Sequence, residues 1–330
     1  MSRGTNQKLK LAYLTQIMLE KTDEEHALTL AQIMKELEKR DVTAERKSLY
    51  QDFADITDKL GVEIIKEQVG RDTYYHVGSR QFELAEVKLL IDAIQSSKFI
   101  TEKKSRELIK KIKSFASEHQ AKQLERQVYV QGRAKTMNES IYYNVDDIHK
   151  AIAENRKITF KYYKWNIDKK LVERHGGYIF KVSPWALTWD DENYYMVAFD
   201  DQDKKIKHYR VDKMKQIGIS EERREGKEAF KDFDMAAYSK MNFGMYQGDK
   251  KKVTIEFNNS MVGVFLDRFG KDITIRRISK ERSCIVVDVA ISYQFFGWIF
   301  SLGDGVKVTG PDEVVDEMKN AAQRFTELYN

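Results

Sequence analysis

The spacing of apolar residues predicts three short helices and a hairpin at the start of the chain. In residues 11–18 and 30–37, apolar side chains recur at intervals of three and four, the spacing of an amphipathic helix. Thr29 and Gln32 form a capping-box pattern at the start of the second helix. A third helix is expected to begin near Thr43 and to end at Gly61. Residues 62–64 and 73–77 then predict two strands, joined by a turn at 70–72.

Helical spacing returns over residues 82–120, where apolar residues fall on two stripes. These segments are expected to be connecting helices. Between Lys103 and Lys135, lysine and arginine outnumber glutamate ten to three. A basic helix surface of this kind either is simply hydrated or faces an anionic partner, and the sequence leaves both interpretations open.

Residues 157–219 change to the pattern of strands. Short apolar and aromatic runs are separated by polar turns such as residues 190–193. The five predicted strands are residues 158–163, 178–183, 186–189, 194–199 and 206–211. This spacing favours a small closed barrel, because closure removes exposed sheet edges.

The C-terminal segment alternates strands and helices. Strands are expected at residues 253–257, 273–278, 284–290 and 306–309. Helices are expected at residues 261–269, 295–302 and 311–328. The resulting order, β-α-β-β-α-β-α, is that of a ferredoxin-like unit with one added helix.

The composition indicates a globular protein of two or three domains. The chain has 330 residues, of which 42% are hydrophobic and 33% charged. It has no apolar run near the roughly 18 residues of a membrane span, and the apolar residues in 8–19 are too interrupted for a secretory leader. A cytoplasmic location is expected, because the single cysteine, Cys284, cannot form an internal disulfide. The net charge of +5 permits an anionic partner without requiring one.

The predicted third helix has one face that suits the major groove of DNA. On a helical wheel its core stripe consists of Leu49, Phe53, Ile56 and Leu60. The opposite face, flanked by Arg46 and Ser48, carries Thr43, Ala44, Lys47, Tyr50, Gln51 and Ala54. Alanine lets a backbone approach closely, lysine and arginine reach phosphates or guanine, and glutamine can pair with adenine. Arg71, at the tip of the following hairpin, is placed to contact an adjacent backbone or the minor groove.

An ordinary amphipathic helix whose outer face meets water is the alternative for this segment. Residues 1–80 hold thirteen basic against fourteen acidic residues, so the region is not basic overall. The order of helix, helix, helix and hairpin favours the first interpretation. Residues 42–53 resemble the recognition segment of DeoR-like winged helix-turn-helix regulators. That resemblance implies that the residues at matching positions face DNA: Thr43, Arg46, Lys47, Ser48 and Tyr50.

A second candidate surface lies on the predicted strand 206–211. The two-residue period of a strand places His208 and Arg210 together on one face. Nearby strands contribute the aromatic residues Tyr162, Tyr163, Tyr178, Trp185, Tyr194 and Tyr195. Aromatic rings beside basic groups suit stacking on a base while a phosphate is held. The alternative is that these aromatic residues form the core of the barrel.

Residues 183–187, 193–200 and 207–214 resemble a WYL domain, whose naming tripeptide corresponds to residues 194–196. Tyr replaces the Trp and Met replaces the Leu of that tripeptide, which keeps aromatic and aliphatic character. The resemblance implies an Sm-like or SH3-like barrel with a positive pocket for a ligand, regarded in several members as a nucleotide or single-stranded nucleic acid. It also implies that His208, Arg210 and Lys213 contact an anion, that Tyr195 is a pocket aromatic, and that Ser183 donates a hydroxyl.

Residues 266–270 and 292–303 resemble the C-terminal extension, of the WCX type, that follows WYL domains in such regulators. The expected fold class is therefore α+β multidomain. We expect a winged helix-turn-helix at residues 1–80 and a helical linker at 81–140. A WYL barrel is expected at 141–222, followed by a ferredoxin-like extension at 250–330.

Signatures of common enzymes and metal sites are missing from the sequence. Residues 263–271 are spaced wrongly for a phosphate-binding loop, and residues 200–203 lack the glycine and glutamate of an EF-hand. The six histidines show no zinc-binding spacing. Cys284 lies in an apolar strand and is expected to be buried and inert. We therefore expect no catalytic residues, no metal and no cofactor.

The sequence thus favours a bacterial transcription regulator that binds double-stranded DNA as a homodimer and senses an anionic effector, such as a nucleotide or single-stranded nucleic acid. Two winged helices one helical turn apart supply specificity that a single copy lacks. Two alternatives stay open. One is an accessory protein of a phage-defence locus that binds single-stranded nucleic acid, and the other, less favoured, is a nucleotide-processing enzyme.

Overall fold

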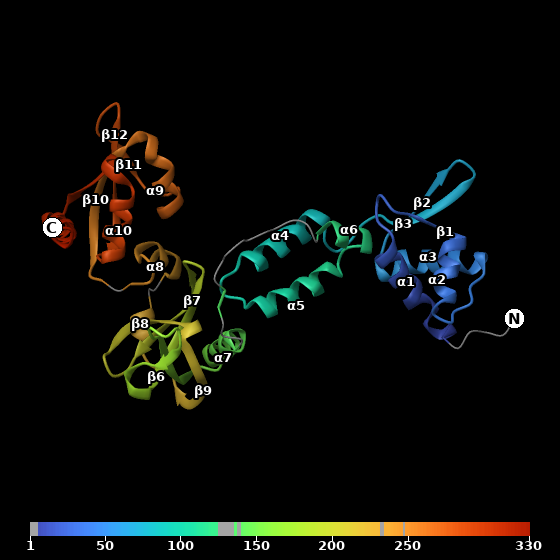
Figure 1. The fold of residues 1–330 in the computed structure, drawn as a ribbon, viewed down its shortest axis with the longest axis horizontal. Coiled ribbons are helices and arrows are strands. Elements are labelled where there is room, and N and C mark those ends of the chain that lie inside the picture. Colours follow the sequence, from blue (N-terminus) through green and yellow to red (C-terminus); the bar gives the residue numbers. More distant parts are fainter. Residues whose placement is uncertain (1–5, 125–134, 137–139, 232–233, 247) are drawn as a thin grey trace. The chain divides into compact units, whose positions relative to one another are not determined.

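The computed structural model describes residues 6–124, 135–136, 140–231, 234–246 and 248–330. The chain divides into two compact units, Met1–Glu139 and Ser140–Asn330 (Figure 1). Within the described ranges, no helix combines the length and the apolar character needed to cross a membrane.

The first unit begins with three helices and a small sheet. The helices are α1 (Lys10–Lys21), α2 (Leu30–Glu38) and α3 (Arg46–Leu60). The strands are β1 (Leu28–Thr29), β2 (Ile64–Val69) and β3 (Asp72–Val77), in the sheet order β1-β3-β2. The predicted order of three helices and a hairpin is confirmed, as is the capping box of Thr29 and Gln32. Apolar residues of all three helices and of β3 form one core, including Leu14, Ile33, Leu49, Phe53 and Val77.

Both ends of α3 differ from the prediction. The helix begins at Arg46 rather than near Thr43, with Glu45 as its N-terminal cap residue. Ala44 therefore lies before the helix, and it packs in the core instead of on the outer face. Leu60 was expected in the core stripe but is 50% exposed, because the helix ends there and Gly61 follows in the left-handed conformation with a φ of 69°.

Three further helices complete the described part of the first unit. They are α4 (Leu84–Ser96), α5 (Glu102–Lys113) and α6 (Glu118–Gln123), and α4 and α5 pack side by side (Figure 1). Part of the predicted basic stretch, residues 125–134, lies outside the described residues. Arg80 ties this region to the first helices, because it donates hydrogen bonds to the carbonyls of Leu19 (2.7 Å) and Thr22 (2.5 Å). The Ser117 hydroxyl also donates to the Asp23 carboxylate.

The second unit opens with α7 (Ile141–Ala153), which the sequence pattern did not predict, and a six-stranded sheet. Its strands are β4 (Arg156–Trp165), β5 (Leu171–Glu173), β6 (Ile179–Asp190), β7 (Asn193–Asp200), β8 (Lys205–Arg210) and β9 (Met214–Arg223). The order is β5-β4-β6-β7-β8, and β9 returns to pair with β4. Helix α7 packs on β4, β6 and β9, and the Asn144 amide donates to the Met214 carbonyl at 2.9 Å.

The prediction of five separate strands in this region is wrong in two ways. Residues 178–183 and 186–189 belong to one strand, β6, which continues through a shift in register between Pro184 and Ala186. In addition, β5 and β9 were not among the predicted strands. Pro184 has no amide hydrogen to donate to a ladder, so it favoured a strand end in the sequence.

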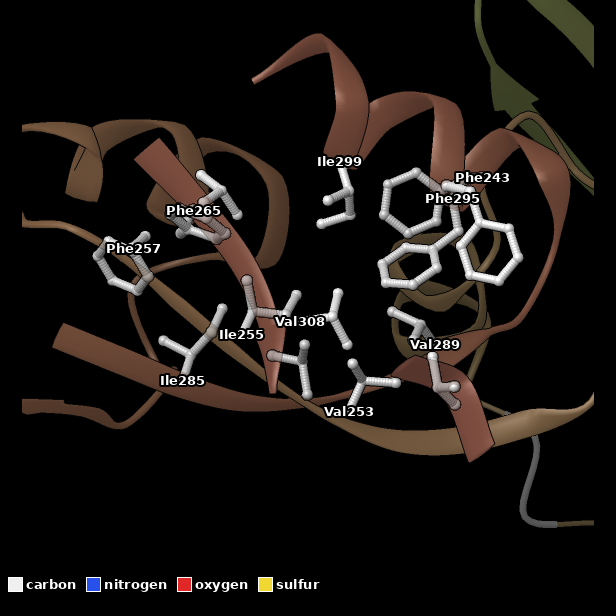
Figure 2. Close-up of a cluster of buried hydrophobic side chains, with 14 of the residues drawn as sticks. Phe243, Val253, Ile255, Phe257, Phe265, Ile285, Val289, Phe295, Ile299 and Val308 are labelled. Atoms are coloured by element: carbon white, nitrogen blue, oxygen red, sulfur yellow. The ribbon is translucent and has the colours of Figure 1, made fainter. Parts of the chain in front are cut away.

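The C-terminal part of the second unit confirms the predicted order β-α-β-β-α-β-α. Its elements are β10 (Lys250–Asn258), α9 (Val262–Phe269), β11 (Ile275–Arg277), β12 (Arg282–Ala290), α10 (Tyr293–Ser301), β13 (Val306–Gly310) and α11 (Asp312–Leu328). The sheet is antiparallel in the order β11-β12-β10-β13. Its core includes Phe257 stacked on Phe265, with ring centroids 4.2 Å apart (Figure 2). Cys284 is buried in β12, as expected.

Short elements connect these parts. Helix α8 (Met235–Met241) lies between the two sheets of the second unit in the sequence. Single 3-10 turns occur at η1 (Gln7–Leu9), η3 (His175–Gly177), η4 (Val211–Lys213), η5 (Lys227–Phe230), η6 (Asn259–Met261) and η7 (Gly303–Gly305). The four predicted domain boundaries stay predictions.

Candidate functional site

The outer face of α3 presents most of the predicted DNA-contacting side chains to solvent within the first unit. Arg46, Lys47, Tyr50 and Gln51 are all exposed, and Thr43 is exposed just before the helix. Ser48 is half-buried. These side chains supply two positive charges, an amide and hydroxyls along successive turns, which suits phosphate oxygens and base edges.

Two residues outside α3, Lys10 and Gln7, support this face and were not predicted from the sequence. The Lys10 ammonium lies 2.5 Å from the Asp52 carboxylate and donates to the Ser48 hydroxyl at 3.0 Å, so α1 is bonded to the first turns of α3. Gln7 binds both backbone groups of Thr43: its amide donates to the carbonyl at 2.9 Å, and the amide hydrogen of Thr43 donates back at 3.2 Å. The sequence could not predict these roles, because Lys10 and Gln7 are 36 or more positions away from the residues that they bond.

Arg71 lies where it was predicted, in the turn between β2 and β3, and its side chain is exposed. Gly70 beside it has a φ of 65°, the left-handed conformation that a tight turn requires. The two strands around Arg71 carry Lys66 as well as Glu67 and Asp72, so the hairpin has no net positive charge.

In the second unit, Tyr195 and Arg210 lie directly opposite each other on β7 and β8. The Arg210 guanidinium donates to both carboxylate oxygens of Asp212, at 3.0 and 2.9 Å, and to the Asn193 side-chain oxygen at 2.8 Å. Its backbone amide donates to the Tyr162 hydroxyl at 3.1 Å. Burial raises the pKa of Tyr195 to about 12, so this phenol stays protonated and can donate a hydrogen bond.

Lys213 joins the same group. Its ammonium lies 3.5 Å from the Asp212 carboxylate and 5.1 Å from the centre of the Trp165 ring. Burial lowers the pKa of Lys213, although Asp212 opposes the shift. Two cations, Arg210 and Lys213, thus share one carboxylate beside exposed and buried aromatic rings. We call Tyr195, Arg210, Asp212 and Lys213 the Arg210 cluster.

His208 has different surroundings from those expected of an open anion contact. Its Nδ1 lies 2.9 Å from the Met245 carbonyl and its Nε2 lies 2.8 Å from the Tyr238 hydroxyl. Because a carbonyl can only accept, Nδ1 carries the hydrogen and Nε2 accepts from Tyr238. Burial lowers the pKa of His208, so the ring is neutral near pH 7. His208 therefore binds the segment around α8 and adds no positive charge at this pH.

Ser183 lies in another polar cluster. Its side chain is fully buried, accepts from the Glu225 amide at 2.9 Å and lies 3.4 Å from an Asp201 carboxylate oxygen to which it donates. The neighbouring Lys157 ammonium is paired with Asp201 at 2.6 Å and Glu225 at 2.7 Å. Ser183 pairs with Phe199, four residues along β7 from Tyr195, a separation of about 13 Å at the usual strand rise. Ser183 is thus apart from the Arg210 cluster.

The aromatic residues of this region divide between core and surface. Tyr195 and Tyr209 are buried, as the core alternative expected, while Trp165 is 45% exposed beside Lys213. Trp185 is covered by the Arg224 guanidinium, 4.2 Å from the ring centre, and donates to the Glu225 carbonyl at 2.8 Å. Of the six aromatic residues named from the sequence, Tyr195 is buried, Tyr178 is 43% exposed and the other four are partly buried, and stacking of a base on any of them stays a prediction. The described residues contain no group of three or more metal-binding side chains.

Two family models match the second unit. Residues 143–219 match the WYL domain and residues 249–326 match the WCX domain. Together they cover most of the six-stranded sheet, most of α7 and nearly all of the C-terminal fold.

Two solved structures are similar over most of the chain at low identity. Proteasome accessory factor B/C (PafBC) of Arthrobacter aurescens is 18% identical, with a TM-score of 0.28, and the match covers 94% of this chain and 46% of that one. The chain therefore spans less than half the length of that protein. A CRISPR Cas-related protein is 13% identical, with a TM-score of 0.36, and the match covers 100% of this chain and 87% of the other. No curated protein matches the chain.

Proposed function

We propose that this protein is a transcription regulator that binds duplex DNA with its first unit and an anionic effector with its WYL domain. The observation that carries the proposal is the exposed polar face of α3, bonded from behind by Lys10. The order of three helices and a hairpin supports a winged helix-turn-helix, with α3 as its recognition helix and Arg71 on its wing. The proposal includes a homodimer, two adjacent half-sites and a cytoplasmic location, and assigns no catalytic role.

The Arg210 cluster supports the effector part of the proposal. Arg210 and Lys213 offer two cationic donors, and the protonated Tyr195 adds a neutral one, a set suited to a phosphate group. The exposed ring of Trp165 beside Lys213 can stack on a base. We therefore propose a nucleotide, free or at the end of a single strand, as the effector class.

The contact of His208 with Tyr238 and Met245 suggests how occupancy changes the rest of the protein. His208 and Arg210 point to the same face of β8, two residues and about 7 Å apart. An effector that extends from Arg210 toward His208 competes with Tyr238 for this face. The α8 segment then has two arrangements, one with Tyr238 bonded to His208 and one with Tyr238 displaced. The ligand changes their populations because it binds the second arrangement more tightly.

A gel-shift titration tests the DNA-binding part. The probe is the duplex immediately upstream of the reading frame, compared with a shuffled duplex of the same composition. Lys47→Ala with Gln51→Ala should abolish the preference for the upstream duplex. The matched control is Gln16→Ala with Lys35→Ala, which removes the same residue types from exposed positions on α1 and α2. Unchanged discrimination by the α3 variant would reject α3 as the recognition helix.

The alternative of a single-strand-binding accessory protein is favoured by one feature of the WYL domain. Lys213 lies over Trp165, and Lys215 lies over Tyr163 at 4.9 Å, so two basic–aromatic pairs project from the same part of the sheet. Titrating the protein against duplex and single-stranded oligonucleotides of equal length, at one salt concentration, separates the two functions. Tighter binding of every single strand than of any duplex would favour the accessory protein.

A further inference from the structure

Helix α5 has an apolar side and a strongly basic side. Ile109 and Ile112 pack against Val87 and Ile91 of α4, and Ser105 is buried on the same side. The remaining faces carry six basic residues, Lys103, Lys104, Arg106, Lys110, Lys111 and Lys113, and two acidic ones, Glu102 and Glu107. Six positive charges less two negative ones leave four on a helix of 12 residues, which is about 18 Å long.

The two glutamates are already engaged with basic residues of the helix. Glu102 lies 3.5 Å from Arg106, and Glu107 lies 3.3 Å from Lys104. Lys110 and Lys111 are exposed and form no ion pair with any residue that the structure describes. They extend the basic surface onto the last turns of α5.

The arrangement of these charges is unfavourable for an isolated helix. Lys103, Arg106, Lys110 and Lys113 follow one another at intervals of three and four residues, so their side chains are neighbours along one stripe. Each like-charge pair at this spacing costs about 0.2–0.5 kcal/mol. The ion pair between Arg106 and Glu102 offsets part of this repulsion, and an anionic partner along the stripe offsets more of it.

The rest of the first unit is short of positive charge for a DNA-binding protein. Residues 1–80 carry thirteen basic and fourteen acidic residues, a net charge of −1. Duplex DNA affinity depends largely on basic side chains that neutralise phosphates and release counterions. A recognition helix in a nearly neutral domain therefore gains affinity from phosphate contacts made outside that domain.

We infer that α5 is a second DNA-contacting element, whose basic stripe, together with the adjacent exposed Lys111, binds the sugar-phosphate backbone of duplex DNA. The inference rests on the proposed function. Contacts between the helical segment and the first helices support joint action: Ser117 bonds Asp23, Glu118 pairs with Lys21 at 2.6 Å, and His119 stacks on His26 with ring centroids 3.8 Å apart. Contacts to phosphates supply affinity without sequence preference, while α3 supplies the preference.

The salt dependence of DNA binding by the full chain tests this inference. The probes are the upstream duplex and its shuffled counterpart, each titrated at several salt concentrations. For Lys110→Gln with Lys111→Gln, the slope of log K against log [salt] should fall in magnitude by about 1.8, because each phosphate contact contributes about 0.9. The affinity for both duplexes should fall by the same factor. Glutamine and lysine have similar helix propensities, so the helix is retained.

Two further variants serve as controls. Lys252→Gln with Lys307→Gln removes the same charge from exposed positions on β10 and β13 and should leave the slope unchanged. Lys110→Arg with Lys111→Arg keeps the charge and should keep the wild-type slope. A slope for the α5 glutamine variant equal to that of the β10 and β13 control overturns the inference.

The outcomes distinguish this inference from the proposed function. If the α3 variant loses discrimination while the α5 variant keeps the wild-type slope, the proposed function stands and the role of α5 is wrong. If the α5 variant loses discrimination rather than overall affinity, α5 reads bases and the backbone assignment is wrong. If the wild-type chain binds no duplex even at low salt, both proposals fail.

Discussion

The Nε2 atom of His208 lies 2.8 Å from the hydroxyl of Tyr238, so a strand of the WYL domain is bonded directly to the helix that precedes the WCX domain in sequence. A second bond, from His208 Nδ1 to the Met245 carbonyl, fixes the ring from its other side. His208 thus contacts two points of one connecting segment. Loss of either bond is therefore expected to lower the stability of the second unit.

Tyr238→Phe should destabilise the second unit by about 1–2 kcal/mol, because Nε2 of the partly buried His208 loses its hydrogen-bond donor. Urea unfolding measures the loss. Tyr178→Phe is the matched control, since the Tyr178 hydroxyl donates to Gln202 on an exposed surface, at 3.1 Å, and its loss should cost less. Equal effects of the two substitutions would contradict a structural role for the His208 bond.

Acid should weaken the second unit through His208. Burial holds the pKa of His208 below its ordinary value of 6.5. Below pH 6.5 the unfolded chain therefore takes up a proton that the folded protein does not, and stability falls by up to about 1.4 kcal/mol per pH unit until the folded pKa is reached. Wild type should lose more stability between pH 7.5 and 5.5 than His208→Gln. Parallel pH profiles for the two proteins would show that this residue does not contribute.

Lys10→Met should destabilise the first unit by about 1–3 kcal/mol, because Asp52 then keeps its charge in a half-buried position without its partner. Adding Asp52→Asn should recover part of the loss, since the unpaired charge is removed. Thermal unfolding of both variants measures the difference. Asp52→Asn alone gives the cost of the second substitution. If the double variant loses as much stability as the two single variants added together, the two side chains are not coupled.

Asp212→Asn should strengthen binding of an anionic effector about tenfold, because Arg210 and Lys213 no longer share a carboxylate. Arg210→Ala should abolish the effector response while DNA binding without effector is retained. Calorimetric titration with inorganic phosphate and with a mononucleotide measures the first effect, and gel shifts measure the second. Weaker binding by Asp212→Asn would place the anion site outside the Arg210 cluster.

Lys157→Met should cost about 1–3 kcal/mol, because it leaves the Asp201 carboxylate without its partner beside a buried position. Although burial alone would lower it, the carboxylates of Asp201 and Glu225 raise the pKa of Lys157. Lys251→Met is the control: Lys251 pairs with Glu313 at 2.7 Å on the surface, away from this network, and its loss should cost less. Urea unfolding measures both losses, and the midpoints can be compared directly if the two variants unfold with the same m-value. Equal losses would contradict a structural role for Lys157.

Local pattern was sufficient for much of the fold. The capping box at Thr29, the buried stripe of Leu49, Phe53 and Ile56, and the order of the C-terminal elements are confirmed. These features depend on neighbouring residues or on burial of a single face. The order of elements in the first unit is confirmed for the same reason.

The remaining features depend on contacts between distant parts of the sequence. Ala44 lies in the loop between α2 and α3 and packs in the core, because of how these two helices meet. The helical periodicity of the sequence wrongly placed it on the outer face of α3. His208 and Ser183 have the residue types of ligand contacts, yet Tyr238 and Glu225 bind them from segments 30 and 42 positions away. The assignment of site residues therefore stays a prediction for the experiments above.

The pairing of β4 with β9 sets the order in which the WYL sheet can be completed during synthesis. Its first strand pairs with its last, so the hairpins in between can form as they leave the ribosome, but β4 keeps an open edge until Arg223 has emerged. During that interval the unpaired edge of β4 is available for pairing with other nascent chains. Helix α7 is made before β4 and packs on it, so it is in place to cover one face of β4 while translation continues.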